Sequence, residues 1–186
     1  MIAAALIGAM LAAIPARAGP ASAAATATAT ATGSASAEVI AALVVTRTAD
    51  LDFGTILASP AAGTVTVSPA GAVGFAGGAR PACGAAACGG PHAARFLVRG
   101  EPGRAYTVVA PVQVIASGQA AAPGAATPQG LLVDDLTVQT ASRGGAGGTL
   151  DSGGDDSFNL GGTLRLPAGT PPARYRAVVP VTVIYG

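Results

Sequence analysis

The sequence contains no tryptophan, no lysine, one histidine and two cysteines in 186 residues. Only 10% of the residues are charged, against about a quarter in an average soluble domain. The formal net charge of +1 gives no basic surface for nucleic acid. Without lysine, and with His92 as the single histidine, few groups remain that could act as a general base or an amine nucleophile. We therefore expect neither an enzyme nor a nucleic-acid-binding protein.

Small residues are what the sequence has in excess: 46 are alanine and 27 are glycine, and 51% of all residues are hydrophobic. After the first twenty residues, no apolar stretch of about 18 residues runs without Gly, Pro or a polar interruption, so we expect no membrane span after processing. The composition indicates a secreted, weakly charged, β-rich structural protein.

The first residues have the features of an export signal. An apolar run from Ile2 to Ile14 is followed by Pro15 and by the small-x-small sequence Ala16-Arg17-Ala18. We predict a signal peptide over residues 1–18, with cleavage as late as Ala23 as an alternative. A buried N-terminal helix or a membrane anchor is the competing interpretation. We therefore expect the protein in the periplasm, on the cell surface or outside the cell.

Residues 19–37 form a low-complexity lead-in in which alanine and threonine alternate from Ala25 to Thr32. One interpretation is a linker left after processing. The other is a β-strand, because a period of two would place every alanine on one face and every threonine on the other.

From residue 38 the chain predicts a single all-β domain ending at residue 186, an immunoglobulin-like or pilin-like antiparallel β-sandwich. Short runs rich in Val, Ile, Leu, Thr and Tyr are separated by Gly, Pro, Ser and Asp, and no sustained helical pattern occurs. Three segments rich in small residues and proline are expected as loops, at 77–91, 118–130 and 141–157. The predicted strands are Val39–Thr48, Leu51–Ile56, Gly63–Ser68, Ala72–Phe75, Ala94–Arg99, Ala105–Ala110, Val112–Ala116, Leu131–Thr140, Phe158–Leu166 and Arg174–Tyr185.

Cys83 and Cys88 are expected to form a disulfide, because a lone pair of cysteines behind a signal peptide is usually oxidised. The Gly-rich sequence around them allows the tight turn that the bridge needs. A metal site would add His92 but would still lack a fourth ligand. We expect no metal, no cofactor and no catalytic residues.

The carboxylates gather at Asp134-Asp135 and at Asp151, Asp155 and Asp156. Oxygen ligands in the second group could hold calcium, although the spacing is not that of an EF-hand. Paired carboxylates also serve glycosidases, but this chain has few aromatic residues to grip a sugar. Solvated turn residues are the simpler interpretation.

The C-terminus carries the clearest alternation in the chain. Pro180 cannot donate a ladder hydrogen bond, so the last strand is expected at a sheet edge or kinked there. It is either an ordinary last core strand or an assembly strand that a partner recognises by β-augmentation. Every second position is apolar or aromatic: Tyr175, Ala177, Val179, Val181, Val183 and Tyr185.

Several short motifs occur in a characteristic order between about residues 24 and 186. They are Leu51-Asp52-Phe53-Gly54, Gly63-Thr64-Val65-Thr66-Val67, Phe96-Leu97-Val98-Arg99-Gly100-Glu101-Pro102-Gly103 with Tyr106, Gly161-Gly162-Thr163-Leu164, Pro167-Ala168-Gly169 and Val181-Thr182-Val183-Ile184-Tyr185. Together they resemble a bacterial exported family known as domain of unknown function number 4402. That family is similar in turn to spore coat protein U and to pilin subunits of archaic chaperone–usher systems.

The resemblance implies an incomplete immunoglobulin-like sandwich that is completed by a donated β-strand. It also implies like subunits and a periplasmic chaperone as partners, with the C-terminal strand as the one a chaperone grips. The Ala25–Thr32 run would be a source of the donor strand. We therefore expect an exported structural or adhesive subunit, pilus-like or coat-like. The alternative is a self-sufficient β-sandwich that binds a carbohydrate or a protein through its loops.

Overall fold

The computed structural model describes residues 29–82, 90–120 and 127–186. The chain divides into two units, Met1–Glu38 and Val39–Gly186. In the first unit, the described residues 29–38 are exposed and belong to no strand. The second unit contains strands, turns and loops but no helix in its described part, and therefore no helix long and apolar enough to cross a membrane.

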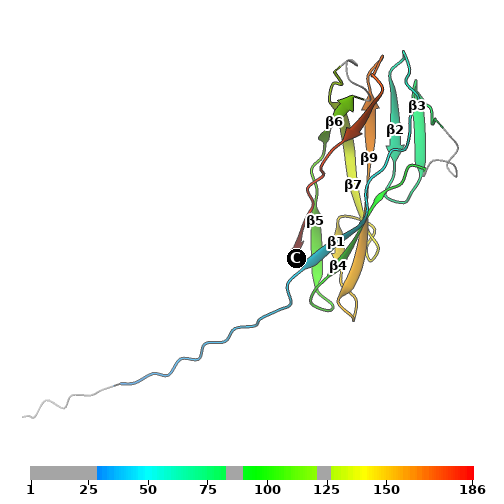
Figure 1. The fold of residues 1–186 in the computed structure, drawn as a ribbon. Coiled ribbons are helices and arrows are strands. Elements are labelled where there is room, and N and C mark those ends of the chain that lie inside the picture. The colour runs from blue at the N-terminus through cyan, green and yellow to red at the C-terminus, as the bar shows by residue number, and fades with distance from the viewer. Residues whose placement is uncertain (1–28, 83–89, 121–126) are drawn as a thin grey trace, which may run out of the picture. The chain divides into compact units, whose positions relative to one another are not determined.

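Eleven strands make up the described part of the second unit (Figure 1). They are β1 (Val44–Ala49), β2 (Gly63–Val67), β3 (Val73–Gly77), β4 (Ala94–Arg99), β5 (Ala105–Val109), β6 (Val114–Ala120), β7 (Leu131–Thr140), β8 (Gly147–Thr149), β9 (Asp155–Leu166), β10 (Ala173–Arg176) and β11 (Thr182–Tyr185).

All strand pairs are antiparallel, and they form a large sheet and a small one. The large sheet has the order β1-β4-β9-β7-β6-β10, and β2 also pairs with β9 and carries β3 on its other side. The small sheet has the order β11-β5-β8. The prediction of an all-β antiparallel sandwich is confirmed.

The central strand β9 exchanges partners along one of its edges. Asp155 to Leu160 pair with β4, and Gly162 to Leu166 pair with β2, whereas β7 runs along the other edge. Gly161 lies at the exchange. A Cβ there would come within 2.3 Å of the Val67 carbonyl oxygen, so the close approach of β2 requires glycine at this position.

Two clusters of apolar side chains form the core. The first joins β2, β6, β7 and the second half of β9, and is centred on Val65, Leu131, Val133 and Leu164. The second joins β4, β5 and the first half of β9 around Val98, Tyr106 and Phe158. Within it, the rings of Phe96 and Phe158 stack with their centroids 4.7 Å apart.

The predicted strand Leu51–Ile56 is not a strand in the structure. Only isolated bridges occur there, between Asp52 and His92 and between Ile56 and Pro81. The chain turns at Gly54, whose φ of 73° is left-handed and whose amide binds the Asp52 carboxylate at 2.7 Å. Phe53 and Ile56 still pack against the first core cluster, which explains their apolar pattern.

Two other expectations need correction. The segment 141–157, expected as a loop, contains β8 and the start of β9. The last strand, expected over Arg174–Tyr185 at a sheet edge or kinked at Pro180, is divided into β10 in the large sheet and β11 in the small one. Pro180 lies in the interruption, and both strands are edge strands, as its missing N–H predicted.

Candidate functional site

A long groove of about 1300 Å³ is the main candidate site of the Val39–Gly186 unit. One wall is Arg47 with residues 50–59, and the other is the C-terminal segment 170–179. The floor is the inner face of the large sheet. It is formed by Ala94, Phe96, Ala116, Leu131, Val133, Leu160 and Leu164.

The first wall is hydrogen-bonded on one side only. Within the described residues, the backbone bonds of residues 50–58 join Asp52 to His92, Leu57 to Arg80 and Thr55 to Ala82. All of these partners belong to the segment that follows β3. At the end of the wall, the Ser59 carbonyl accepts the N–H of Gly169, and the Gly54 N–H donates to the Asp52 carboxylate. The other backbone N–H and C=O groups of residues 50–58 have no backbone partner within the described residues, so they are open to pairing with another strand.

The opposite wall has a second unpaired backbone. β10 pairs only with β6, and residues 177–181 make no backbone hydrogen bond within the described part of the chain. Val178 is 86% exposed, which is unusual for a large apolar side chain next to a sheet. Two segments with unused backbone groups thus line the same apolar groove.

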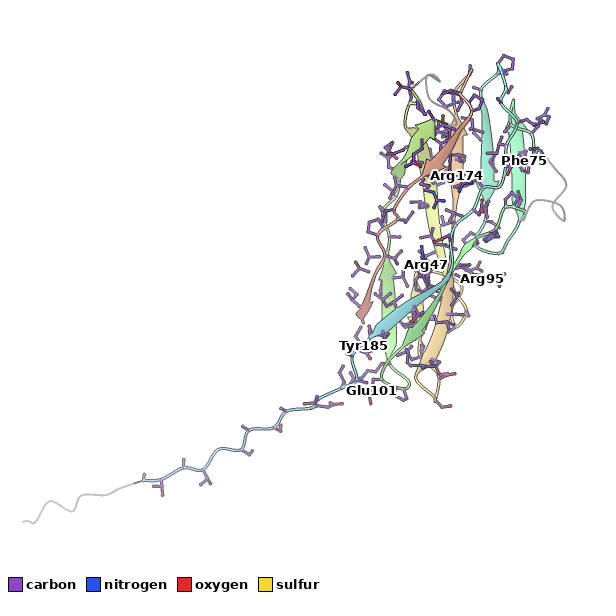
Figure 2. All side chains as sticks on the ribbon, in the orientation of Figure 1. Arg47, Phe75, Arg95, Glu101, Arg174 and Tyr185 are labelled. Carbon is purple, nitrogen blue, oxygen red and sulfur yellow. The ribbon has the colours of Figure 1, made fainter. Side chains whose placement is uncertain are left out.

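The floor of the groove is already well packed. Leu160 is 1% exposed and Leu131 is 2% exposed, so these floor side chains are already covered by their neighbours in the core. The charged residues of the first wall are the exposed pair Arg47 and Asp50, and Asp52. Arg174 and Arg176 lie on the other wall, and Figure 2 labels Arg47 and Arg174. An extended segment with small side chains at alternate positions suits this shape.

Along the C-terminal segment, half-buried and exposed residues alternate with one exception. The side chains of Tyr175, Val179, Val181, Val183 and Tyr185 are half-buried, and the residues between them are exposed, but Ala177 is exposed as well.

Tyr175 belongs to the first core cluster and donates a hydrogen bond of 3.0 Å to the Pro171 carbonyl. Burial raises the pKa of its phenol. Val181, Val183 and Tyr185 pack against the second cluster. The C-terminal segment therefore spans both halves of the core.

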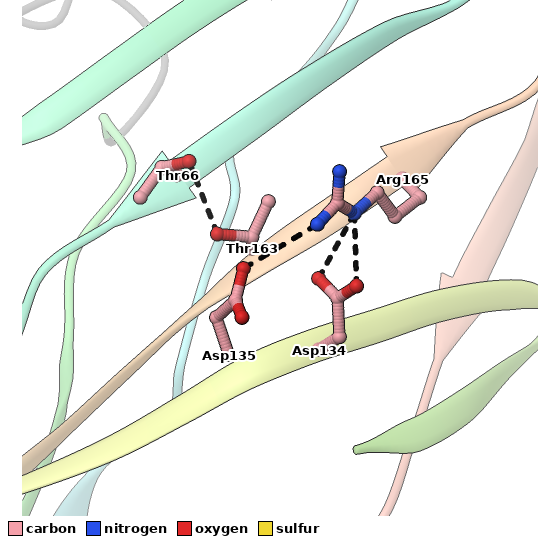
Figure 3. Close-up of polar contacts among 5 residues, drawn as sticks. All are labelled: Thr66, Asp134, Asp135, Thr163 and Arg165. Atoms are coloured by element: carbon pink, nitrogen blue, oxygen red, sulfur yellow. Dashed lines mark hydrogen bonds and ion pairs between the residues drawn. The ribbon is translucent and has the colours of Figure 1, made fainter. Parts of the chain in front are cut away.

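The paired carboxylates Asp134 and Asp135 are bound by an arginine of the neighbouring strand (Figure 3). The Nε of Arg165 lies 3.0 and 2.9 Å from the two oxygens of Asp134, and Nη2 lies 3.4 Å from Asp135. β7 is bulged between Asp134 and Thr137, and Asp135 has a φ of 52°. These carboxylates hold a bulge against β9, and neither lies in the groove.

Asp151 and Asp155 also have structural partners. The Asp151 carboxylate accepts the amides of Asp155 and Gly153 at 2.9 and 2.8 Å, and these bonds lower its pKa. Asp155 is paired with Arg99 at 2.6 Å. In the described residues, no three His, Cys, Asp or Glu side chains are grouped so as to hold a metal ion.

Asp156 accepts hydrogen bonds from Tyr106 at 2.7 Å and from Ser142 at 2.5 Å. Tyr106 is 1% exposed, and burial, followed by the bond to Asp156, raises the pKa of its phenol well above the ordinary value. These contacts tie β5, the turn after β7 and β9 together.

From the buried Tyr106 phenol and its hydrogen bond to Asp156, we predict that the domain loses stability at alkaline pH. A phenol with a raised pKa in the folded state contributes stability below its unfolded pKa of about 10, and this is lost as the pH rises further. We expect the melting temperature to fall above about pH 10 and the Tyr106→Phe variant to show a weaker fall, after an initial cost of about 1.5–3 kcal/mol for the lost bond to a carboxylate. Thermal melts of both proteins from pH 7 to 11 check this. Parallel curves would contradict it.

Of the remaining predicted residues, only His92 lies in the described part of the chain. His92 is exposed, and its Nδ1 lies 3.0 Å from the Gly90 carbonyl oxygen. Cys83 and Cys88 lie outside the described residues, and so do residues 1–28 with the predicted signal peptide. The sequence indicated the C-terminal wall but not the wall at residues 50–59. The apolar residues Phe53 and Ile56 beside Gly54 were the signal available there.

A scan against protein families matches residues 43–185 to the family described as Domain of unknown function (DUF4402). The chain belongs to this family. Searches of curated proteins and of solved structures found no match. The DUF4402 match begins at Leu43 and ends at Tyr185, which both pack in the second core cluster, and it leaves the Ala/Thr run outside.

Proposed function

We propose that the protein is an exported structural or adhesive subunit, pilus-like or coat-like, that assembles by β-strand donation. The observation that carries the proposal is the groove between two walls with unused backbone hydrogen-bonding groups. A strand that entered the groove would pair with this backbone and cover the apolar floor, which is the chemistry of β-augmentation. Before assembly, a periplasmic chaperone would occupy the same surface.

The donor in this proposal is the Ala/Thr segment of another copy, residues 25–37. Thirteen extended residues span roughly 43 Å, which is more than the ten-residue wall formed by residues 50–59 requires. The small alanine side chains match a floor that is already packed. The described part of this segment, from residue 29 to residue 37, is exposed and therefore available to a partner.

Charge also favours association. The predicted mature chain retains nine arginines against nine acidic residues, and a net charge near zero gives little electrostatic resistance to assembly.

A proline scan of the donor segment tests the proposal. We expect the purified full chain to sediment as oligomers and the Thr28→Pro/Thr32→Pro variant to be monomeric, because proline removes the N–H groups that a donated strand needs. The matched control, Thr28→Ser/Thr32→Ser, keeps the alternation and every N–H group and should assemble normally. Sedimentation velocity gives the size distribution of all three proteins.

Two results would refute strand donation by this segment. One is a monomeric unmodified chain, which would favour the alternative of a self-sufficient domain that binds through its loops. The other is equal assembly of the proline variant and the unmodified chain.

A further inference from the structure

The backbone N–H and C=O of Ala41 are each bound by a side chain from elsewhere in the domain. Its N–H donates to Glu101 Oε2 at 3.0 Å, and its carbonyl accepts from the Tyr185 hydroxyl at 2.7 Å. The same hydroxyl accepts the N–H of Glu101 at 2.7 Å. We call this set of three hydrogen bonds the Ala41 clamp. Figure 2 shows Tyr185 and Glu101 at the same end of the domain.

The clamp is tightly packed. A Cβ added at Gly100 would lie 2.4 Å from the Tyr185 hydroxyl and 3.0 Å from Leu43. The rest of the Tyr185 side chain and Leu43 both pack against the second core cluster. The core therefore fixes the position of the Tyr185 hydroxyl, and its hydrogen bond restricts the backbone of Ala41.

In the sequence, Ala41 lies between the proposed donor segment and the first residue of the groove. Ala41 follows the last donor residue, Ala37, by four positions and precedes Arg47, the first groove residue, by six. Neither Tyr185 nor Glu101 lines the groove. The clamp therefore acts on the root of the donor segment without occupying the site that receives it.

A donor segment can insert into the groove of another copy or fold back into the groove of its own domain. The two insertions compete. Short flexible linkers give effective concentrations in the millimolar range. Against subunits at micromolar concentration, self-insertion would be favoured about a thousandfold if nothing opposed it. Self-insertion requires the chain to reverse direction between Ala37 and Arg47.

We propose that the Ala41 clamp prevents this self-insertion and so directs the donor segment to another copy. This inference rests on the proposed function. Ala41 lies in the segment that would have to reverse, and both its N–H and its C=O group are already engaged, by Glu101 and Tyr185. A reversal that reoriented Ala41 would break both bonds. Tyr185 and Glu101 are thus positioning residues for assembly between subunits.

The Tyr185→Phe and Glu101→Ala variants test the clamp in the full chain. Both are expected to shift the protein from oligomers to monomers, with residues 25–37 becoming protected from hydrogen exchange within the monomer. Glu101→Gln is the matched control, because its amide oxygen can still accept the Ala41 N–H, and it should assemble like the unmodified chain. Sedimentation velocity and hydrogen exchange by mass spectrometry give the two readouts.

The possible outcomes separate the clamp from the proposed function. If the unmodified chain assembles and both variants assemble to the same extent, the clamp proposal is wrong and strand donation survives. If the variants are monomeric but residues 25–37 exchange freely, the clamp proposal is also wrong, because no self-insertion has occurred. If the unmodified chain is itself monomeric, strand donation is refuted, and the clamp proposal, which depends on it, is refuted with it.

Discussion

Replacing Gly161 with alanine is expected to lower the free energy of unfolding by about 3 kcal/mol, the upper end of the usual cost of overpacking. The added Cβ would meet the Val67 carbonyl oxygen at 2.3 Å and the Pro69 nitrogen at 2.6 Å. Both are backbone atoms, so no side-chain rotation relieves the clash. For a domain of this size, the melting temperature should fall by roughly 6–12 °C.

Gly74→Ala is the matched control for this prediction. Gly74 lies in β3, and a Cβ there would have no atom within 4 Å. Alanine is also the better residue in a strand interior, so the change should stay within about 0.5 kcal/mol. Chemical unfolding of the three proteins measures both values. Equal stability of the two variants would show that the backbone at the end of β2 does not lie as close to Gly161 as in this structure.

The close contact at Gly161 explains why one of the short sequence motifs begins with glycine. In Gly161-Gly162-Thr163-Leu164, the first glycine lets β2 leave the edge of β9 so that β4 can take its place. Thr163 forms a hydrogen-bonding contact of 3.1 Å with Thr66 across the strand pair (Figure 3), and Leu164 belongs to the groove floor. The motif thus builds a part of the large sheet that lines the groove.

Strands with a complete hydrophobic alternation were predicted well from the sequence. Ala94–Arg99 alternates throughout and has the predicted ends. Leu131–Thr140 also has the predicted ends, although its alternation is looser and a bulge between Asp134 and Thr137 divides it between the two core clusters. Prediction failed where glycine carries the structure. Gly147-Gly148 resembles a loop in sequence, yet it is strand β8, because only a residue without Cβ leaves space for the buried ring of Tyr106.

The candidate site was only partly visible in the sequence, for a similar reason. The alternating C-terminal residues indicated an edge strand, and Pro180 indicated its interruption. Which segment forms the opposite wall depends on hydrogen bonds between Asp52 and His92, forty residues apart in the chain. Tyr185 and Ala41 are 144 residues apart in the sequence, so their contact leaves no local pattern that could predict it.

The stacked pair Phe96 and Phe158 connects the stability of the domain with its proposed assembly. Phe158 is 1% exposed, whereas Phe96 is half-buried and lines the groove. Because a fully buried phenylalanine costs about 3–5 kcal/mol when it is truncated, Phe158→Ala should lose a large share of the roughly 5–15 kcal/mol that stabilises a typical domain. Phe96→Ala should cost clearly less, since part of its ring is already in water.

The assembly readout should rank the two phenylalanines differently. If a donated strand covers the groove, the exposed face of Phe96 becomes buried on assembly, and Phe96→Ala should remain folded but assemble weakly. Phe96→Leu keeps an apolar floor and serves as the matched control, with assembly closer to that of the unmodified chain. Chemical unfolding and sedimentation velocity on the same samples separate the two effects. Normal assembly of the Phe96→Ala variant would show that the donated strand does not reach this end of the groove.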